Sequence, residues 1–421
     1  MDSDIKRVLV VEDNPIVLKI LKHLVKQELN QSTYEVDYVD SMLGAKELIE
    51  ENNYFASIAD LNLPDSPDGE VVQYLLESGI PCIVLTANYS EERREKLLVT
   101  GIVDYVVKDS RFSFGYAVKL VHRLALNEKI KILVVEDSRT ARKYVCDLLL
   151  RHQFQIIEAD NGIRALALYE EHPDIRLIIT DYHMPEMDGF ELVREIRGRS
   201  DKSDLAIIGL SSVEKSTLSA KFIKNGANDF LQKPFFPEEL HCRVIHNLES
   251  IELIQALNDA AHKDYLTGLH NRRYMFDSGE ALYDRAKRGD SPLALAVMDI
   301  DAFKHINDTY GHEAGDAVLM FMGKLLREAF SRFLPVRFGG EEFCILLPGL
   351  TQAQAHSLMD QFRARIEEEG IYFEDNYLQV TMSIGVTSQL RNSLDEMVKI
   401  ADEQLHRAKA LGRNLVIGDT S

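Results

Sequence analysis

Residues 7–14 read Arg-Val-Leu-Val-Val-Glu-Asp-Asn, and residues 131–138 repeat the phrase as Lys-Ile-Leu-Val-Val-Glu-Asp-Ser. The spacing of the two phrases is a domain length, whereas solenoid repeats recur every 20–50 residues or so. After each phrase, amphipathic stretches alternate with short apolar runs, which predicts a parallel sheet covered by helices. We therefore expect two tandem doubly wound α/β domains, called here the first copy (residues 1–127) and the second copy (residues 128–250).

Both copies place the same kinds of polar residue at the ends of successive predicted strands. They are Glu12, Asp13, Asp60, Thr86 and Lys108 in the first copy, and Glu136, Asp137, Asp181, Ser211 and Lys233 in the second. An aspartate can act as a nucleophile that forms an acyl phosphate, while neighbouring acids hold Mg²⁺ and a lysine neutralises phosphoryl charge. A solvated acidic cluster at a sheet edge is the alternative, and the repetition of five matched positions argues against it.

The second copy resembles the receiver domains of two-component response regulators through TDYHMPEMDGFELV (180–193) and NDFLQKPF (228–235). The first copy resembles them less closely, because the loop after Asp60 has one additional residue before Gly69 and because Asp109 instead of proline follows Lys108. The resemblance implies that Asp60 and Asp181 are phosphoacceptors and that a sensor histidine kinase or phosphotransfer protein is a partner. The irregular loop favours Asp181 as the main acceptor.

The same resemblance implies further roles for the matched residues. Mg²⁺ would be bound by Glu12, Asp13 and Asp60 in the first copy and by Glu136, Asp137 and Asp181 in the second, and the switch residues would be Thr86, Tyr105, Lys108, Ser211, Phe230 and Lys233. Core packing is an equally simple interpretation of the aromatic residues Tyr105 and Phe230, since a switch aromatic must also pack.

Downstream, Gly339-Gly340-Glu341-Glu342-Phe343 places two glycines and two acids between apolar segments, as at the tip of a hairpin. Glycines let backbone approach a ligand closely, and acids can hold a divalent cation against phosphate. The apolar run Leu293 to Met298 ends in Asp299, at a strand exit where open sheets usually bind ligands. Asp299 and Glu341 are expected to meet there. Two carboxylates about 4 Å apart repel by roughly 4 kcal/mol, which predicts a cation between them, Mg²⁺ or Mn²⁺.

From Asp264 to about Ile417 the sequence resembles the GGDEF family of diguanylate cyclases, through DYLTGLHNRR (264–273), MDIDAFKHINDTYGHEAGD (298–316), GGEEF, MSIGV (382–386) and ADEQLHRAKALGRN (401–414). The resemblance implies a mixed α/β nucleotide-cyclase-like domain that condenses two GTP molecules into cyclic di-GMP and two pyrophosphates. Each such domain holds one GTP, so activity is expected to need a homodimer.

The GGDEF resemblance also implies site residues. Asp299, Glu341 and the carbonyl of Ile300 would bind the metal, Glu341 would help deprotonate the attacking 3′-hydroxyl, and Glu342 would support it. Asn307 and Asp316 would read guanine, Lys304, Lys409 and Arg413 would hold the triphosphate, and Phe303, His312, Gly339 and Gly340 complete the implied GTP site. Lys409 and Arg413 are expected four apart on one helix face, for which a solvated surface is the alternative.

One departure concerns product inhibition. Many GGDEF proteins carry Arg-x-x-Asp five residues ahead of the first glycine, whereas this chain has Phe330 and Phe333 at those positions. A phenyl ring cannot supply the cationic fork of an arginine. We therefore predict that product inhibition through that site is absent.

Composition limits the remaining possibilities. The 421 residues carry a formal net charge of −20, which argues against nonspecific binding to nucleic acid or anionic membranes. No apolar run approaches the ~20 residues needed to cross a bilayer, so we expect a cytoplasmic protein. Four scattered cysteines, Cys82, Cys146, Cys242 and Cys344, fit buried thiols rather than disulfides or a zinc site.

The sequence between the second copy and the GGDEF-like segment predicts a continuous helix from Pro237 to about Lys263, of which residues 251–263 would be a linker before a catalytic domain at 264–421. Its apolar stripe, at Leu240, Val244, Leu248, Ile251, Leu257 and Ala261, either packs on its own domains or forms a two-helix seam across a dimer. A phosphorylation-regulated enzyme is the main hypothesis. A catalytically silent adaptor that binds nucleotide or a partner protein is the alternative.

Overall fold

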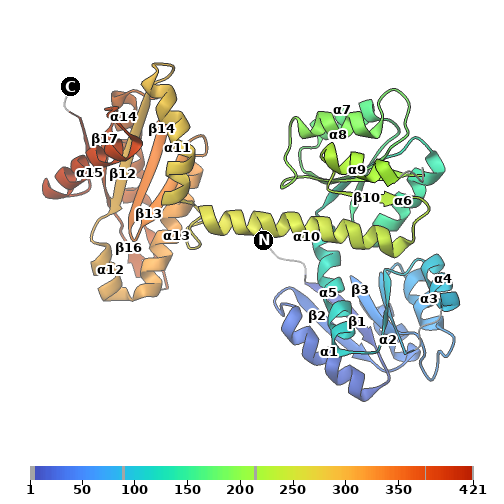
Figure 1. Ribbon diagram of the computed structural model, residues 1–421. Coiled ribbons are helices and arrows are strands. Elements are labelled where there is room, and N and C mark those ends of the chain that lie inside the picture. The colour runs from blue at the N-terminus through green and yellow to red at the C-terminus, as the bar shows by residue number, and fades with distance from the viewer. Residues whose placement is uncertain (1–4, 88–90, 213–215, 375, 420–421) are drawn as a thin grey trace. The chain divides into compact units, whose positions relative to one another are not determined.

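The computed structural model describes residues 5–87, 91–212, 216–374 and 376–419. The chain forms two compact units, Met1–Ile254 and Gln255–Ser421, called here the N-terminal and C-terminal units. Figure 1 shows the elements of each. Among the described residues, no helix is both long and apolar enough to span a membrane.

The first copy is a five-stranded sheet of order β2-β1-β3-β4-β5 in which every neighbouring pair is parallel. Its elements are β1 (Lys6–Val11), α1 (Pro15–Glu28), β2 (Tyr34–Val39), α2 (Met42–Glu51), β3 (Ala56–Asp60), α3 (Glu70–Glu77), β4 (Cys82–Thr86), α4 (Glu91–Thr100), β5 (Asp104–Val107) and α5 (Arg111–Asn127). Alternate residues of β1 serve opposite faces, since Val8 and Val10 pack in the cluster containing α1 and α5, and Leu9 packs in the cluster containing α3.

The second copy repeats this plan with strand order β10-β9-β8-β6-β7, again all parallel. Its elements are β6 (Lys131–Val135), α6 (Arg139–Arg151), β7 (Gln155–Ala159), α7 (Gly162–Glu171), β8 (Ile175–Asp181), α8 (Gly189–Arg197), β9 (Ala206–Ser211), α9 (Ser216–Lys224), β10 (Asp229–Gln232) and α10 (Pro237–His262). The prediction of two doubly wound domains is confirmed.

The long helix α10 is continuous, as predicted, but its apolar stripe divides. Leu240, Val244, Leu248 and Ile251 are buried in the core of the second copy. Further along, Leu253 and Leu257 are 62% and 61% exposed. The first part of the helix therefore packs on its own domain, and the later part presents apolar side chains to solvent.

The C-terminal unit is built on a six-stranded mixed sheet of order β11-β13-β14-β12-β17-β18, in which β12 is antiparallel to both β14 and β17. Its elements are β11 (His270–Asn271), α11 (Arg272–Lys287), β12 (Leu293–Ile300), α12 (Phe303–Tyr310), α13 (His312–Ala329), β13 (Leu334–Gly339), β14 (Glu342–Pro348), α14 (Gln352–Glu369), β15 (Ile371–Phe373), β16 (Asn376–Leu378), β17 (Met382–Thr387), α15 (Leu394–Ala410) and β18 (Val416–Gly418). The expected mixed α/β class is confirmed.

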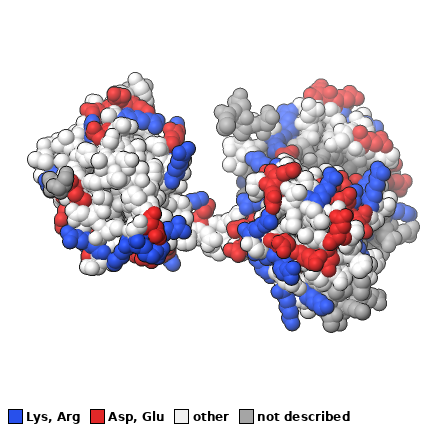
Figure 2. Space-filling model, turned by 90° about the horizontal axis from the view of Figure 1, so that it is seen from above, with Lys and Arg blue, Asp and Glu red and all other residues white. Residues whose placement is uncertain are grey.

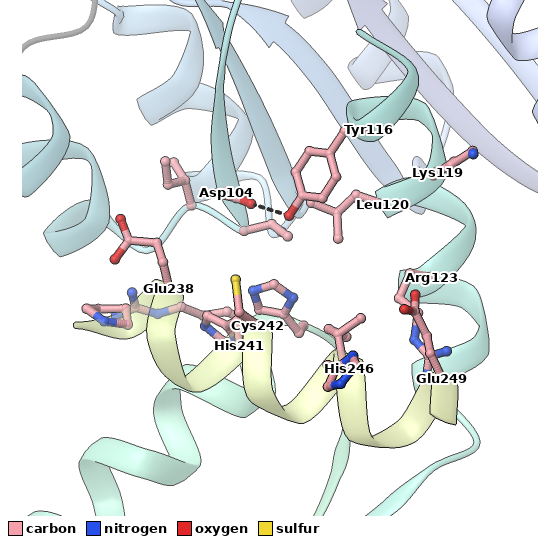
Figure 3. Close-up of a pocket in the computed structure, with 16 residues that line it drawn as sticks. Asp104, Tyr116, Lys119, Leu120, Arg123, Glu238, His241, Cys242, His246 and Glu249 are labelled. Atoms are coloured by element: carbon pink, nitrogen blue, oxygen red, sulfur yellow. Dashed lines mark hydrogen bonds between the residues drawn. The ribbon is translucent and has the colours of Figure 1, made fainter. Parts of the chain in front are cut away.

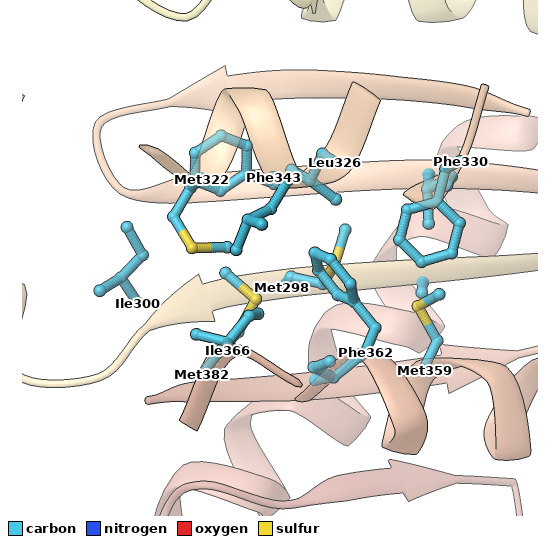
Figure 4. Packing of buried hydrophobic residues seen from close by; sticks show 14 of the residues in the cluster. Met298, Ile300, Met322, Leu326, Phe330, Phe343, Met359, Phe362, Ile366 and Met382 are labelled. Carbon is cyan, nitrogen blue, oxygen red and sulfur yellow. The ribbon is translucent and has the colours of Figure 1, made fainter. Parts of the chain in front are cut away.

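A methionine- and phenylalanine-rich core fills one face of this sheet. Figure 4 shows Met298, Phe343 and Met382 from the strands packed with Phe330 and Phe362 from the covering elements. Phe330 is 1% exposed and meets Phe362 edge to face. Every residue of β12 is buried, so this central strand holds Asp299 rigidly at its end.

Two surface features complete the fold. On the face of the N-terminal unit in Figure 2, Lys and Arg lie interspersed with Asp and Glu. Cys82, Cys146 and Cys344 are buried as expected, but Cys242 is exposed. That part of the expectation is wrong, because Cys242 lies on α10 between the positions that turn toward the core.

Candidate functional site

The first copy brings its predicted acids and lysine together at the carboxyl ends of β1, β3 and β5. The Lys108 ammonium donates to Asp60 Oδ2 at 2.6 Å and to Glu12 Oε2 at 2.7 Å. Oxygens of Glu12, Asp13 and Asp60 lie within 4.8 Å of one another, and Glu12 and Asp60 are buried while Asp13 is exposed. Burial raises the pKa of Glu12, against the hydrogen bond from Lys108.

The second copy repeats the arrangement. Lys233 binds Asp181 at 2.5 Å and also contacts Glu136. Burial lowers the pKa of Lys233, but its hydrogen bonds to the two carboxylates outweigh burial, and the net shift is upward. Asp137 is exposed, and among the described residues only the first copy gathers three acids within 4.8 Å. The acid trio is thus tighter in the copy with the less regular loop.

The predicted switch residues lie on strands beside these acids. Thr86 and Ser211 end β4 and β9 and are buried. Tyr105 and Phe230 are half-buried and pack against the hydrophobic clusters of their copies. Their packing agrees with the core interpretation and leaves the switch role a prediction.

The C-terminal unit places Asp299 beside the acids of the glycine-rich tip. The β12–β14 register pairs Asp299 with Glu342, and the Ile300 amide donates to the main-chain oxygen of Glu341 at 3.3 Å. Gly340 and Glu341 connect β13 to β14. Gly339, the last residue of β13, pairs in the register with Glu342, the first residue of β14. The predicted hairpin tip and the meeting of the two strand ends are both confirmed.

A lysine from a distant helix contacts this acidic end. Lys409 Nζ on α15 lies 2.8 Å from Asp299 Oδ2. Burial raises the pKa of Asp299, Lys409 opposes the shift, and Glu341 adds to it. Burial also raises the pKa of Glu342, and the charge of Asp299 contributes. Crowded carboxylates of this kind are stabilised by a nearby cation.

The hairpin tip is tied to the start of the unit by an arginine that sequence reasoning did not assign. Arg337 on β13 donates to the Gly340 carbonyl at 2.8 Å and 3.0 Å and to Asp264 at 2.9 Å and 3.1 Å. Asp264 also accepts hydrogen bonds from Thr267. The DYLTGL stretch is therefore joined by hydrogen bonds to the acidic tip. The sequence feature that could have pointed to Arg337 is its position as a cation between the apolar residues Val336 and Phe338.

Several residues predicted to contact GTP lie on α12 and α13, the two helices that follow β12 in the chain. Lys304, His312 and Asp316 are exposed, and Phe303 packs against the core. Asn307 on α12 faces α13 at a glycine, because a Cβ at Gly315 would lie 1.9 Å from Asn307 Oδ1. The glycine thus leaves room for the amide that is expected to read guanine.

The expectation that Lys409 and Arg413 share a helix face is wrong. Helix α15 ends at Ala410, and Gly412, Arg413 and Asn414 have positive φ values of 125°, 64° and 48°. The chain reverses here so that β18 can join the sheet beside β17. Arg413 is exposed in this turn.

Asp301 holds that turn and was missed as a functional candidate. Its buried carboxylate accepts hydrogen bonds from Ser383 Oγ at 2.6 Å, Thr381 Oγ1 at 2.9 Å and the Asn414 amide at 2.9 Å. These donors are remote in the sequence, so no local pattern could reveal them. Asp301 positions the segment that carries Arg413.

The donor sets fit Mg²⁺, which prefers oxygen ligands. In the first copy, the convergence of three carboxylates satisfies the requirement for a hard cation. In the C-terminal unit, Asp299, Glu341 and the Ile300 carbonyl would hold the ion, and the contact of Asp299 with the Lys409 ammonium shows that this carboxylate already pairs with a cation.

Two known protein families match these segments of the chain. The response regulator receiver domain matches residues 8–114 and 132–245, which together exceed half of the chain. The diguanylate cyclase, GGDEF domain, matches residues 261–415.

Individual relatives match different shares of the chain. Response regulator PleD of Caulobacter vibrioides is 32% identical over 301 residues, which are 68% of this chain and 65% of PleD. Diguanylate cyclase DgcP of Pseudomonas aeruginosa is 40% identical over 153 residues, 36% of this chain and 23% of DgcP. A crystal structure assigned to the two-component system response regulator/GGDEF domain proteins has 48% identity and a TM-score of 0.54, and covers 59% of this chain and 99% of that one. The chain thus spans about two thirds or less of these curated relatives.

Proposed function

We propose that this chain, which belongs to the response regulator receiver family and also carries a GGDEF domain, is a diguanylate cyclase controlled by phosphorylation. The reaction joins two GTP molecules into cyclic di-GMP and releases two pyrophosphates. The observation that carries the proposal is the buried Asp299 beside the acidic hairpin tip, with Lys409 on its carboxylate.

The residues support a division of labour in this reaction. The 3′-oxygen of one GTP attacks the α-phosphorus of the other, a new P–O bond forms, and the bond to pyrophosphate breaks. Glu341 accepts the hydroxyl proton, while Lys304, Lys409 and Arg413 offset phosphate charge. Mg²⁺, when bound, supplies charge neutralisation at the phosphates, which is the main requirement of such transfers.

The active form is a homodimer in this proposal. One GGDEF domain holds one GTP, so two chains must present their nucleotides to each other across a two-fold axis. The exposed apolar side chains of Leu253 and Leu257 on α10 support a helical seam between chains. Phosphorylation of Asp181, and of Asp60, would favour the arrangement in which two GTP-loaded domains meet.

A direct assay tests the activity. Purified protein is incubated with GTP and Mg²⁺, and the products are separated by chromatography. Cyclic di-GMP and pyrophosphate in a one-to-two ratio are expected. GTP binding without any cyclic di-GMP, over a range of protein concentrations that includes the dimer, would instead indicate a silent adaptor.

A second assay tests regulation separately. We expect a small-molecule phosphodonor to raise the cyclase rate of the parent protein several-fold, and to leave a D60N/D181N variant at its basal rate. The single variants then report which copy carries the effect. An equal response of parent and double variant to the phosphodonor would reject phosphorylation control without affecting the proposed activity.

A further inference from the structure

A cavity of about 350 Å³ lies inside the N-terminal unit, where the two copies meet. Its walls come from α5 and the Ile102–Asp104 segment of the first copy, and from α10 and the Arg151–His152 segment of the second. Figure 3 shows Tyr116 and Leu120 of α5 facing His241 and Cys242 of α10 across it. The volume is in the range of small-molecule sites, about 300–1,000 Å³.

Buried polar atoms without partners gather around this cavity. Among the described residues, hydrogen bonds are missing at Arg123 Nη2, both ring nitrogens of His152, His241 Nδ1 and Glu238 Oε2. Arg123 is 7% exposed and His152 is 2% exposed. An unsatisfied buried polar group costs about 1–3 kcal/mol, so such a concentration indicates a site that another molecule completes.

The two histidines form one surface of the site. Their rings stack with centroids 3.6 Å apart. Burial lowers the pKa of His152 to about 4, and the charge of Arg151 contributes in the same direction. The Val103 main chain opposes this shift but makes no hydrogen bond of normal geometry to the ring. Both rings are therefore neutral at pH 7, and each carries one N–H that can donate.

Two acids that line the cavity already accept a side-chain hydrogen bond, whereas donor atoms of Arg123, His152 and His241 have no acceptor among the described residues. Asp104 accepts a hydrogen bond from Tyr116 at 2.8 Å, and Glu238 accepts one from Arg94 at 2.7 Å. Arg123 donates hydrogen bonds to Glu252 through Nη1 and to Asn127 through Nε, and its Nη2 has no acceptor in the described part of the chain. Apart from the acceptor Glu238 Oε2, the unpartnered atoms of the cavity are thus those of a guanidinium and two imidazoles, next to the apolar side chains of Val103, Leu120 and Ile245.

We propose that this cavity binds a small organic carboxylate. Its anionic group accepts hydrogen bonds from Arg123 Nη2 and the His152–His241 pair, and its apolar body packs on Val103, Leu120 and Ile245. A metal ion does not fit, because among the described residues three acidic, thiol or imidazole ligands converge only at Glu12, Asp13 and Asp60.

Such a ligand would stabilise the packing of the two copies. Asn127 at the end of α5 already donates to the His152 carbonyl at 2.9 Å, so a hydrogen bond joins the two copies at this contact. A molecule that contacts both copies binds only when they are packed together, and its binding energy adds to their association. The site is thus suited to link a metabolite concentration to the arrangement of the receiver domains.

The test uses full-length protein and a matched pair of probes, 3-phenylpropanoate and its neutral amide 3-phenylpropanamide. Isothermal titration calorimetry and ligand-observed NMR measure binding. We expect saturable binding of the carboxylate with one site per chain, at least tenfold weaker binding of the amide, and a rise in the melting temperature with the carboxylate.

Two variants place the binding in the cavity. H241F keeps a ring to stack on His152 but removes the donor, and is expected to weaken carboxylate binding at least tenfold. I245F places a larger side chain in the apolar wall, which narrows the cavity, and is expected to weaken the binding of both probes. H23F, at an exposed position on α1, is the control and should bind as the parent does.

Three outcomes would overturn the proposal. The first is the absence of saturable carboxylate binding, which would leave water as the only occupant. The second is equal affinity for the carboxylate and the amide. The third is carboxylate binding that is unchanged in both folded variants. Circular dichroism establishes that the variants are folded. If H241F does not fold, I245F alone decides between a bound probe in the cavity and one elsewhere.

Discussion

Asp299 and Asp301 lie two residues apart at the exit of β12, and their partners differ. Asp299 faces the hairpin tip and Lys409, and it carries a raised pKa. Asp301 is satisfied by Ser383, Thr381 and the Asn414 amide. In the proposed site the first would hold a cation, whereas the second holds a turn. Their substitution should therefore affect the protein in different ways.

We expect D299N to lower the cyclase rate at least a hundredfold while the protein stays folded. The amide has nearly the same shape, but it removes the negative charge that would bind the metal. The measurement is the initial rate of cyclic di-GMP formation, with the melting temperature as a check on folding.

D360N is the matched control for D299N, because Asp360 is an exposed acid on α14. It should keep the parent rate. Full activity of D299N would contradict the proposed site.

D301N is expected to destabilise the C-terminal unit by about 1–3 kcal/mol, since an amide cannot replace a carboxylate that accepts three hydrogen bonds. The turn that carries Arg413 would loosen, so the KM for GTP should rise more than kcat falls. Unfolding in urea and steady-state kinetics measure the two effects. A variant with lower stability but unchanged KM would show that Asp301 serves the fold alone.

Among the elements, the segment between α13 and β13 occupies the place of the product-inhibition site that many GGDEF proteins are expected to have. Phe330 is buried against Phe362, and Phe333 packs on the same core. These aromatic side chains serve the hydrophobic core at the positions where many family members are expected to carry an arginine and an aspartate. The segment thus contributes to the core, and we predict that it does not recognise a nucleotide.

We predict that added cyclic di-GMP does not inhibit this enzyme noncompetitively. Initial rates at several GTP concentrations, with and without added cyclic di-GMP, distinguish noncompetitive from competitive inhibition. Competition with GTP at the active site is compatible with the prediction. A fall in kcat at saturating GTP that disappears on substitution of Phe333 would be contrary to it.

Helix α10 is the second element with a testable role. Its residues Leu253 and Leu257 are exposed and apolar, in contrast to the buried stripe that precedes them. If they form the dimer seam, L253Q/L257Q should raise the dimer dissociation constant at least tenfold and lower specific activity at low protein concentration. Analytical ultracentrifugation measures the first effect and the cyclase assay the second.

The control for this variant is I163Q, which replaces an apolar side chain that is 53% exposed on α7. It should leave dimerisation unchanged. A fully dimeric L253Q/L257Q protein would assign the seam to another surface.

At the scale of the whole molecule, the packing of the two copies buries the His152–His241 pair, and this makes stability depend on pH. The folded-state pKa of His152 is lowered to about 4, so its contribution is present above the unfolded value near 6.5 and is lost as pH falls toward 4. His241 shifts in the same direction. Asp104, with its pKa raised to about 6, has the opposite effect and gains stability as pH falls.

We expect the parent to lose roughly 2 kcal/mol more than an H152F variant between pH 7 and pH 5, because only the parent must keep His152 neutral while the unfolded chain takes up a proton. Urea unfolding of the two proteins at both pH values measures this difference. Since Asp104 is present in both, its effect cancels. Parallel pH dependence of parent and variant would show that His152 titrates normally.

The class of each domain and most of the residues at the strand ends could be predicted from the amino-acid sequence. Short buried strands followed by acids carry this information locally, because a strand of apolar residues fixes where its last residue emerges. The repeated phrase at Arg7 and Lys131 and the glycine-acid tip at Gly339 could therefore be interpreted without coordinates. The direct contact of Lys409 with Asp299, by contrast, depends on how α15 packs on the sheet.

Contacts between residues far apart in the chain could not be predicted and are seen only in the folded molecule. The positive φ values after α15 removed Arg413 from the helix, and the donors to Asp301 come from β17 and from that turn. The cavity between the copies likewise joins side chains of α5 and α10 that no spacing relates. Local patterns report which faces are apolar, but the partner of a buried polar group is chosen by packing in three dimensions.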